Sequence, residues 1–215
     1  MRAKLSSEFV GTVFLLIIVV GSGIMGESIS AGNNGIALLI NAIATGAGLY
    51  VLINLFGPIS GAHFNPIVSV HQFFSKKLSG VELFYFICIQ TLAAMCGVFL
   101  THLIFNQEII QHSVKNRSGN HLFFSEIVAT FGLLMTIELL QKKNAEKIPM
   151  SVALYITSAY FFTSSTSFAN PAVTLARSFT NTFSGIDLSC VPLFILAQAI
   201  ALILIFISKN LFEIR

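Results

Sequence analysis

The sequence predicts an all-α membrane protein, with six transmembrane helices and two re-entrant half-helices arranged as an inverted repeat. Composition is the first reason: of the 215 residues, 55% are hydrophobic and only 10% are charged, whereas soluble domains carry about 25% charged residues. Six long apolar runs are the second reason. The third is a pair of similar Asn-Pro segments that interrupt the runs at corresponding places.

The apolar runs define the expected spans, because a transmembrane helix needs about 20 apolar residues. They cover residues 8–26, 36–56, 82–105, 121–140, 149–164 and 188–208. The fifth run is short for a full crossing. The first is too long for a cleaved signal peptide, so we expect a retained span. We expect a single transmembrane domain, residues 1–215, that holds two repeats over about 1–105 and 121–208.

The Asn-Pro segments, residues 60–70 and 165–175, read almost alike. Asn is a preferred N-cap and Pro is preferred at the first helical position, so Asn65 and Asn170 should each begin a helix. We therefore expect segments 57–75 and 165–182 to enter the membrane and turn back. Irregular backbone at membrane depth is tolerated only where protein buries it or a wet cavity hydrates it.

A second repeat relates the first span to the fourth. Residues 7–16 and 125–134 share six identities in ten positions, and each segment contains one glutamate, Glu8 or Glu126. Each half thus has three spans and one half-helix. Because three is odd, the second half must be inverted relative to the first. Inverted repeats that meet at the membrane midplane are typical of transporters and some channels.

The basic residues indicate the topology. Nine of the twelve fall on one side if six spans are threaded from the N-terminus: Arg2, Lys4, Lys76, Lys77, Lys142, Lys143, Lys147, Lys209 and Arg215. The positive-inside rule then predicts that both termini lie in the cytoplasm of a multi-pass cell-membrane protein, which we expect to be a bacterial inner-membrane protein. Lys115 and Arg117 fall in an opposite loop. Arg177 falls in the second re-entrant helix.

Several function classes are excluded or unsupported by the sequence. The net charge of +3 is too small to indicate a nucleic-acid partner. The three cysteines have no metal-binding spacing and read as buried thiols. No nucleophile with a partnered base is recognisable, so we expect neither an enzyme nor a cofactor or metal site.

Over essentially its full length the chain resembles the aquaporin (major intrinsic protein) family, and in particular bacterial aquaglyceroporins. The resemblance is carried by the two Asn-Pro boxes, the lead-in at residues 60–64 and the paired glutamates. It implies a homotetramer in which each subunit holds its own water or solute pore. It also implies that the boxes form the pore constriction: Asn65, Pro66, Ile67, Asn170, Pro171 and Ala172.

The chain departs from the family pattern at two places. Ile67 ends the first box where Ala is usual, and Val173 stands where the family usually has its selectivity-filter arginine. The run from residue 169 to residue 186 is similar to an aquaglyceroporin subgroup associated with arsenic-resistance operons. That similarity adds neutral metalloid hydroxides to glycerol and urea as candidate solutes.

The chemistry of the boxes predicts what could pass. An N-cap asparagine accepts backbone N–H bonds with its side-chain oxygen, which leaves its amide hydrogens to point into a channel. Two helix N-termini add a positive potential at the midpoint. In aquaporin-type pores, lining donors and such helix ends oppose protons and cations. We therefore expect water and small neutral solutes to permeate across the lipid bilayer.

Aligning the chain with the family from each box predicts the narrowest ring. The four positions are Thr45, Ser158, Ser167 and Val173. Their side chains are small, so the sequence predicts passage of solutes larger than water. Arg177, one helical turn beyond Val173, forms a displaced filter in one interpretation. In the other it snorkels to the interface or pairs with a loop carbonyl.

Other residues complete the candidate site. The resemblance places His63 in the cytoplasmic vestibule, as an anchor or a gate. Tyr160 and Phe161 are further candidates for the pore wall. Glu8 and Glu126 would accept hydrogen bonds from the re-entrant loops.

Two alternatives to a solute channel remain open on the sequence. A narrow water-selective channel needs a tighter filter than this chain offers. A proton-coupled transporter would use Glu8 or Glu126 as its proton carrier, because intramembrane carboxylates are rare and functional.

Overall fold

The structure is a computed structural model and describes residues 1–208, so Lys209 and Arg215 lie outside the described residues. Its elements, in chain order, are α1 (Arg2–Ile29), α2 (Asn34–Ser60), α3 (Pro66–Phe74), α4 (Gly80–Ile104), α5 (Asn120–Lys143), η1 (Ala145–Lys147), α6 (Ile148–Phe162), α7 (Pro171–Ala176), η2 (Arg177–Phe179), η3 (Leu188–Cys190) and α8 (Val191–Ser208). Residues 1–208 are all helix, turn and loop, as the composition predicts.

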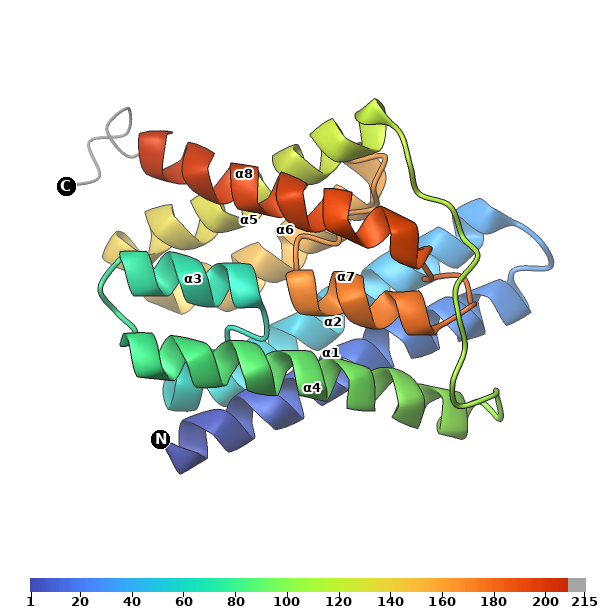
Figure 1. Ribbon diagram of the computed structural model, residues 1–215, viewed down its shortest axis with the longest axis horizontal. Helices are drawn as coiled ribbons and strands as arrows, with labels where there is room; N and C mark the ends of the chain where they lie inside the picture. Colours follow the sequence, from blue (N-terminus) through green and yellow to red (C-terminus); the bar gives the residue numbers. More distant parts are fainter. Residues whose placement is uncertain (209–215) are drawn as a thin grey trace.

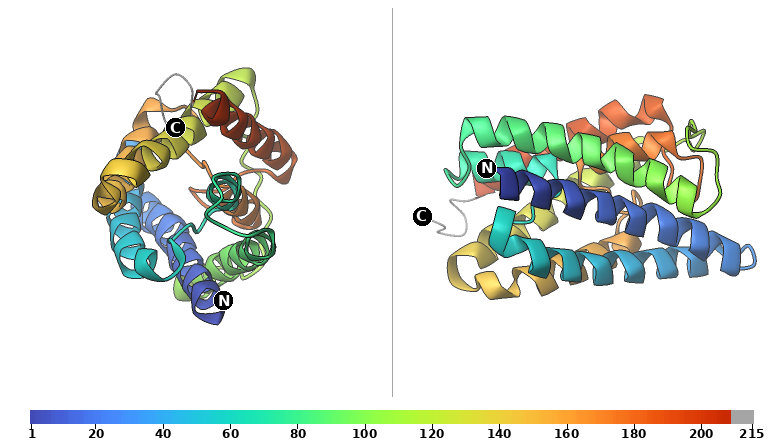
Figure 2. Two further views of the ribbon diagram at one scale, coloured as in Figure 1. Left: turned by 90° about the vertical axis from the view of Figure 1, so that its left-hand side faces the viewer. Right: turned by 90° about the horizontal axis from the view of Figure 1, so that it is seen from below.

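The six longer helices surround the two short ones. Viewed along the bundle, α1, α2, α4, α5, α6 and α8 form a ring, and α3 and α7 lie inside it (Figure 2). In the side view, α3 and α7 follow one another end to end across the middle of the bundle (Figure 1). The two half-helices thus approach the centre from opposite ends.

The lengths of the helices agree with the predicted spans, with two adjustments. Five helices are long and apolar enough to cross a membrane, whereas α6 has 15 residues. At 1.5 Å per residue α6 covers about 22 Å, less than the roughly 30 Å hydrocarbon core. The first re-entrant segment begins at Gly61 and not at residue 57, because α2 tolerates Pro58 in its last turn.

Polarity is distributed inside out relative to a soluble protein. Large apolar side chains project from the outer face, among them Phe84 (63% exposed) and Leu103 (66% exposed). Buried polar side chains lie inside, including Glu8, Gln90, Glu126 and Gln198, each 0% exposed. Lipid can solvate the outer face at no cost, whereas buried charge needs partners inside the protein.

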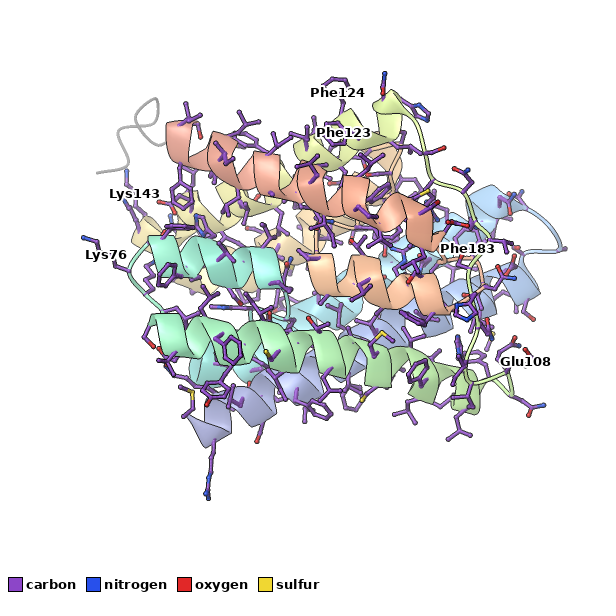
Figure 3. The ribbon with its side chains drawn as sticks, in the orientation of Figure 1. Lys76, Glu108, Phe123, Phe124, Lys143 and Phe183 are labelled. Atoms are coloured by element: carbon purple, nitrogen blue, oxygen red, sulfur yellow. The ribbon has the colours of Figure 1, made fainter. Side chains whose placement is uncertain are left out.

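The two ends of the bundle differ in charge. The N-terminus and the α3–α4 and α5–α6 connections share one end, here called the basic end, where Figure 3 shows Lys76 and Lys143. The long connection between α4 and α5 lies at the other end, here called the opposite end, where Figure 3 shows Glu108. Lys115 and Arg117 belong to that connection.

Small residues allow the helices to approach closely. A Cβ atom added at Gly97 of α4 would lie 2.7 Å from both Leu16 Cβ and the Val13 carbonyl oxygen of α1. A Cβ atom at Gly26 would lie 2.9 Å from the Ala37 carbonyl oxygen of α2. Small residues at such crossings are the usual device for packing helices in membranes.

Candidate pore

Each half-helix begins with an asparagine cap followed by proline. The Asn65 Oδ1 atom accepts a hydrogen bond from the Ile67 N–H at 3.0 Å. The Asn170 Oδ1 atom accepts from the N–H groups of Ala172 and Val173 at 3.0 and 3.2 Å. Proline needs no partner at the first helical position, since it has no N–H. The local sequence therefore fixes where both half-helices start.

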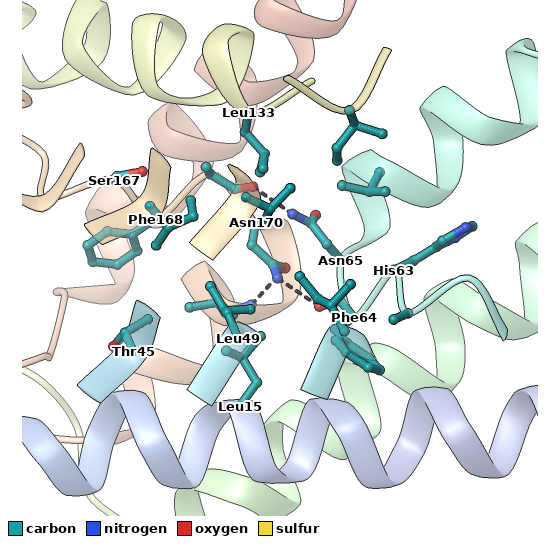
Figure 4. Close-up of a pocket in the computed structure, with 18 of the residues that line it drawn as sticks. Leu15, Thr45, Leu49, His63, Phe64, Asn65, Leu133, Ser167, Phe168 and Asn170 are labelled. Atoms are coloured by element: carbon teal, nitrogen blue, oxygen red, sulfur yellow. Dashed lines mark hydrogen bonds between the residues drawn. The ribbon is translucent and has the colours of Figure 1, made fainter. Parts of the chain in front are cut away.

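The two caps are joined to each other across the centre. The Asn65 amide donates to the Ala169 carbonyl at 2.7 Å, and the Asn170 amide donates to the Phe64 carbonyl at 2.8 Å. Figure 4 shows this crossed pair between the two loops. Each amide group has two N–H donors, so one per asparagine is used and the second remains. The sequence predicted that all the amide N–H donors of Asn65 and Asn170 would be free, and the structure corrects this prediction.

Glu8 holds the loop that precedes α3. Its Oε1 atom accepts from the Ser60 hydroxyl at 2.6 Å and from the His63 N–H at 3.0 Å. Its Oε2 atom accepts from the Phe64 N–H at 2.7 Å and from the Gln90 amide at 2.8 Å. Four donors converge on one buried carboxylate, which is what a buried charge requires.

Glu126 holds the loop that precedes α7 in the same way. It accepts hydrogen bonds from the Phe168 N–H at 3.2 Å, from the Ala169 N–H, and from the Gln198 amide at 2.8 Å. The Asn-Pro boxes are 105 residues apart, and the loop donors Phe168 and Ala169 lie 105 residues beyond His63 and Phe64. Both glutamates thus anchor loops.

A cavity of about 130 Å³ runs along the two half-helices and past both asparagines (Figure 4). Much of its wall is apolar: Leu15, Val19, Leu49, Ile53, Val68, Leu133, Ile137, Ile148, Val152, Ile156 and Val173. At the basic end it is lined by His63, Gln72 and Gln141. Beyond the asparagines it reaches Thr45, Tyr160 and Arg177.

The backbone of the two loops also contributes polar groups to this cavity. In the two loops, the carbonyl groups of residues 61–63 and 166–168 accept no hydrogen bond from any residue in 1–208. All of these residues except Thr166 line the cavity. Unpaired carbonyls at membrane depth need solvation. A row of acceptors therefore follows the lumen on both sides of the crossed asparagines.

Left-handed backbone turns these loops. Gly61, Ala62 and Phe64 have φ values of 92°, 49° and 48°. The equivalent residues of the second loop, Thr166, Ser167 and Ala169, have φ values of 60°, 51° and 46°. The conformation is costly for residues other than glycine, so the anchoring glutamates must hold it.

The structure brings most predicted filter residues to the cavity. Thr45, Ser167, Val173 and Arg177 line it, and His63 lines its basic end. Ile67 and Ala172 are buried behind the caps, at 6% and 2% exposed. Pro66 and Pro171 follow the asparagines as the first residues of α3 and α7.

Ser158 does not belong to the site, and this prediction is wrong. It is exposed on the outside of α6, where its hydroxyl donates to the Tyr155 carbonyl at 2.8 Å. Tyr160 lines the cavity, 3% exposed, with its hydroxyl 3.2 Å from the Thr45 hydroxyl. Two residues rotate a helix by about 200°, so a miscount of two selects the opposite face. Phe161 is 52% exposed and lies outside the cavity.

Arg177 is a buried cation at the far end of the cavity. It is 2% exposed, its Nε–H group donates to the Ser184 carbonyl, and its guanidinium carbon lies 3.5 Å from the centre of the Phe168 ring. The side chain therefore packs inward and does not snorkel to the interface. Hydrogen bonding and stacking on an aromatic face both suit a guanidinium.

Comparison with known proteins gives one consistent family. Residues 1–163 match the family model described as "Major intrinsic protein". The chain is 47% identical to Aquaglyceroporin AqpS of Rhizobium meliloti, over 89% of this chain and 82% of that protein. It is 28% identical to Aquaporin NIP2-2 of Zea mays, over 85% of this chain and 64% of that protein.

A solved structure has the same fold. The aquaglyceroporin from Plasmodium falciparum superposes with a TM-score of 0.73, covering 97% of this chain and 95% of that chain. Sequence identity to it is 17%. That likeness confirms the predicted arrangement of six spans and two half-helices.

Proposed function

The chain belongs to the major intrinsic protein family and is a passive membrane channel, not an enzyme, and from that premise we propose that its pore conducts neutral solutes wider than water. Glycerol, urea and neutral metalloid hydroxides are the solute class. Water passes by the same route. The observation that carries the proposal is the row of unpaired carbonyls along a lumen whose wall is largely apolar.

That lumen matches a molecule with several hydroxyl groups. A hydroxyl both donates and accepts hydrogen bonds. The loop carbonyls accept, and the remaining N–H donors of Asn65 and Asn170 donate. The carbon skeleton of a polyol can lie against the apolar wall opposite. A solute that keeps its hydrogen bonds while leaving water avoids most of the cost of desolvation.

Three of the side chains beyond the asparagines support a wider aperture than a water-selective one. Thr45, Ser167 and Val173 are small, and Tyr160 is held against Thr45 by the hydroxyl contact. Arg177 supplies a fixed positive charge at the same end. A cation would meet this charge in a low-dielectric passage, where repulsion is stronger than in water.

The glutamates argue against proton-coupled transport. The Glu8 and Glu126 carboxylates are 0% exposed and are occupied by loop N–H groups and glutamines. A proton carrier needs an acceptor that faces the transport path. Neither glutamate is among the residues that line the cavity.

The test is uptake of glycerol and urea into proteoliposomes, measured by light scattering. We expect both fluxes to rise linearly with the solute gradient and to be unaffected by a proton gradient. Val173→Phe should reduce glycerol uptake about tenfold or more while water flux falls less, since bulk added to a constriction excludes the larger molecule first. Ser158→Phe introduces the same side chain outside the cavity and is the matched control.

Water flux with no glycerol or urea flux would overturn the proposal in favour of a water-selective channel. Saturable uptake that responds to a proton gradient would favour the transporter instead.

Topology and assembly complete the proposal. The basic end carries Lys76, Lys77, Lys142, Lys143 and Lys147, so we place it and both termini in the cytoplasm of a bacterial inner membrane. We also infer a homotetramer with one pore per subunit, on the family resemblance. Fusing reporters to either terminus tests the first statement, and native mass spectrometry tests the second.

A further inference from the structure

A second cavity continues the path beyond Arg177. It has a volume of about 270 Å³ and lies at the opposite end of the bundle. Its lining residues are Glu27, Asn34, Leu38, Asn41, Lys115, Arg117, Thr166, Arg177 and Phe183. We call it the outer vestibule. Arg177 lines both this vestibule and the central cavity, so a solute entering from this end meets the vestibule first.

Three cations in the vestibule are held by three consecutive carbonyl groups, those of residues 183–185. The Lys115 ammonium donates to the Phe183 carbonyl at 2.7 Å. The Arg177 Nε–H group donates to the Ser184 carbonyl. The Arg117 Nε–H group donates to the Gly185 carbonyl at 2.9 Å. One short segment therefore gathers side chains from two distant parts of the chain.

Hydrogen bonds orient both arginines but use only part of their donors. Each arginine donates to the segment 183–185 through its Nε–H group. Both guanidinium groups also stack on the Phe168 ring, with the guanidinium carbon 3.5 Å from the ring centre for Arg177 and 5.2 Å for Arg117. Within residues 1–208, the four terminal N–H donors of each guanidinium make no hydrogen bond to protein. A guanidinium has five N–H donors in a planar fork. Two forks with spare donors thus line one small cavity.

The charge in the vestibule is unbalanced. Lys115, Arg117 and Arg177 contribute three positive charges, and Glu27 is the one carboxylate among the lining residues, which leaves a net charge of +2. Burial lowers the pKa of Lys115 most, Arg117 and Arg177 lower it further, and Glu27 raises it. Burial lowers the pKa of Arg117, and the nearby Glu126 carboxylate raises it. Burying a cation is costly, and a bound anion would offset that cost.

We propose that the outer vestibule is a binding site for a small oxyanion, and that the bound ion obstructs neutral solutes at this mouth of the pore. Guanidinium forks favour anions that present two oxygen atoms side by side, such as phosphate or a carboxylate, over chloride. The cavity volume of about 270 Å³ leaves room for such an ion. The obstruction rests on the proposed function, whereas the binding does not.

Two measurements test the site independently. The first is calorimetric titration of the purified chain with sodium phosphate, with sodium formate and with sodium chloride, at constant ionic strength. We expect heat of binding for phosphate or formate and none for chloride. Arg117→Gln should weaken that binding about tenfold or more, since it removes a charge-assisted contact. Arg117→Lys keeps the charge without the fork and should bind more weakly than the unchanged chain.

The second measurement is glycerol uptake in phosphate and in chloride of equal ionic strength, present on both sides of the vesicle membrane. Uptake should be slower in phosphate, and Arg117→Gln should remove that difference. Lys76→Gln, at the basic end, is the matched control and should behave like the unchanged chain.

The outcomes separate the two proposals. Absence of glycerol uptake in chloride would count against the solute channel, while the calorimetry would still decide on the site. Equal heats for all three salts, or equal binding by Arg117→Gln and the unchanged chain, would overturn the oxyanion site. Binding without slower uptake would overturn the obstruction. Formate binding alone would support the site and assign it to carboxylates.

Discussion

The two halves of the pore use the same anchors and differ where a solute would be selected. Asn65 and Asn170 cap the half-helices, and Gln90 and Gln198 bond the anchoring glutamates. Moving 105 residues from the basic end to the opposite end, however, replaces His63 with Phe168 and Gln72 with Arg177. All four line the cavity.

This comparison distinguishes the residues that support the loops from the residues that set solute specificity. The matched residues hold the loop backbone and leave its carbonyls free, so they are needed at both ends. The unmatched residues set polarity and charge at each mouth. Along the lumen the basic end thus has the polar side chains of His63, Gln72 and Gln141, while the opposite end concentrates cations.

Replacing one anchoring glutamate should have the largest effect on stability. Glu126→Leu leaves two loop N–H groups without a partner and removes one of the two hydrogen bonds of the Gln198 amide, which keeps its bond to the Thr174 hydroxyl. A buried unpaired donor costs about 1–3 kcal/mol. We expect a loss of about 3 kcal/mol or more, seen as a large drop in thermal stability in detergent. Glu8→Leu should cost a similar amount. Glu146→Gln, on an exposed carboxylate, is the control.

A difference in packing between the halves gives the next effect. A Cβ atom at Gly11 would lie 2.0 Å from the Phe64 ring, which is 1% exposed. The equivalent pair in the second half is Ala129 and Ala169. Gly11→Ala should therefore cost about 1–3 kcal/mol of stability by overpacking. Combined with Phe64→Ala it should cost less than the sum of the two single changes. Additive costs in this double-mutant cycle would contradict the contact.

The left-handed residue at the start of each loop gives a smaller effect on stability, and its direction should differ between the two loops. Gly61 and Thr166 are equivalent, with φ values of 92° and 60°. Gly61→Ala should destabilise by about 1–2 kcal/mol, and a Cβ atom there would also lie 3.0 Å from the His63 ring. Thr166→Gly should raise the melting temperature slightly, since it relieves the same strain. A fall would show that contacts of the Thr166 side chain outweigh it.

The smallest effect should come from the hydroxyl pair at the filter. Tyr160→Phe removes one neutral contact, that to Thr45 at 3.2 Å, which is worth about 0.5–1.5 kcal/mol. We expect little change in thermal stability and a change of a few-fold in the ratio of glycerol to urea uptake. A matched Tyr155→Phe change removes a hydroxyl outside the cavity and should leave that ratio unaltered.

Much of this arrangement could be predicted from the sequence because it depends on local signals. Asn-Pro fixes a helix start, and hydrophobic length fixes a span. The role of Glu8 and Glu126 as acceptors for the re-entrant loops was implied by the family resemblance. The contacts that join distant segments could not be predicted from the sequence. Nothing in the spacing indicates that the carbonyls of 183–185 bond Lys115, Arg117 and Arg177.

The misplacement of Ser158 has a physical cause of the same kind. Counting back from Asn170 crosses the irregular backbone of residues 163–169, where helical phase is lost. Position along α6 could be predicted from its apolar length, but the face of α6 could not. Tyr160 itself carried a signal, since a tyrosine hydroxyl in an apolar span needs a buried partner.

The crossed bonds between the two asparagines have a consequence for how the rate should respond to temperature. Each amide joins its own half-helix to the loop of the other half, so the centre of the pore should keep a constant width. A carrier must rearrange for every molecule it moves and slows steeply on cooling. Transit through a fixed aperture resembles diffusion, and its activation energy should approach that of movement through water.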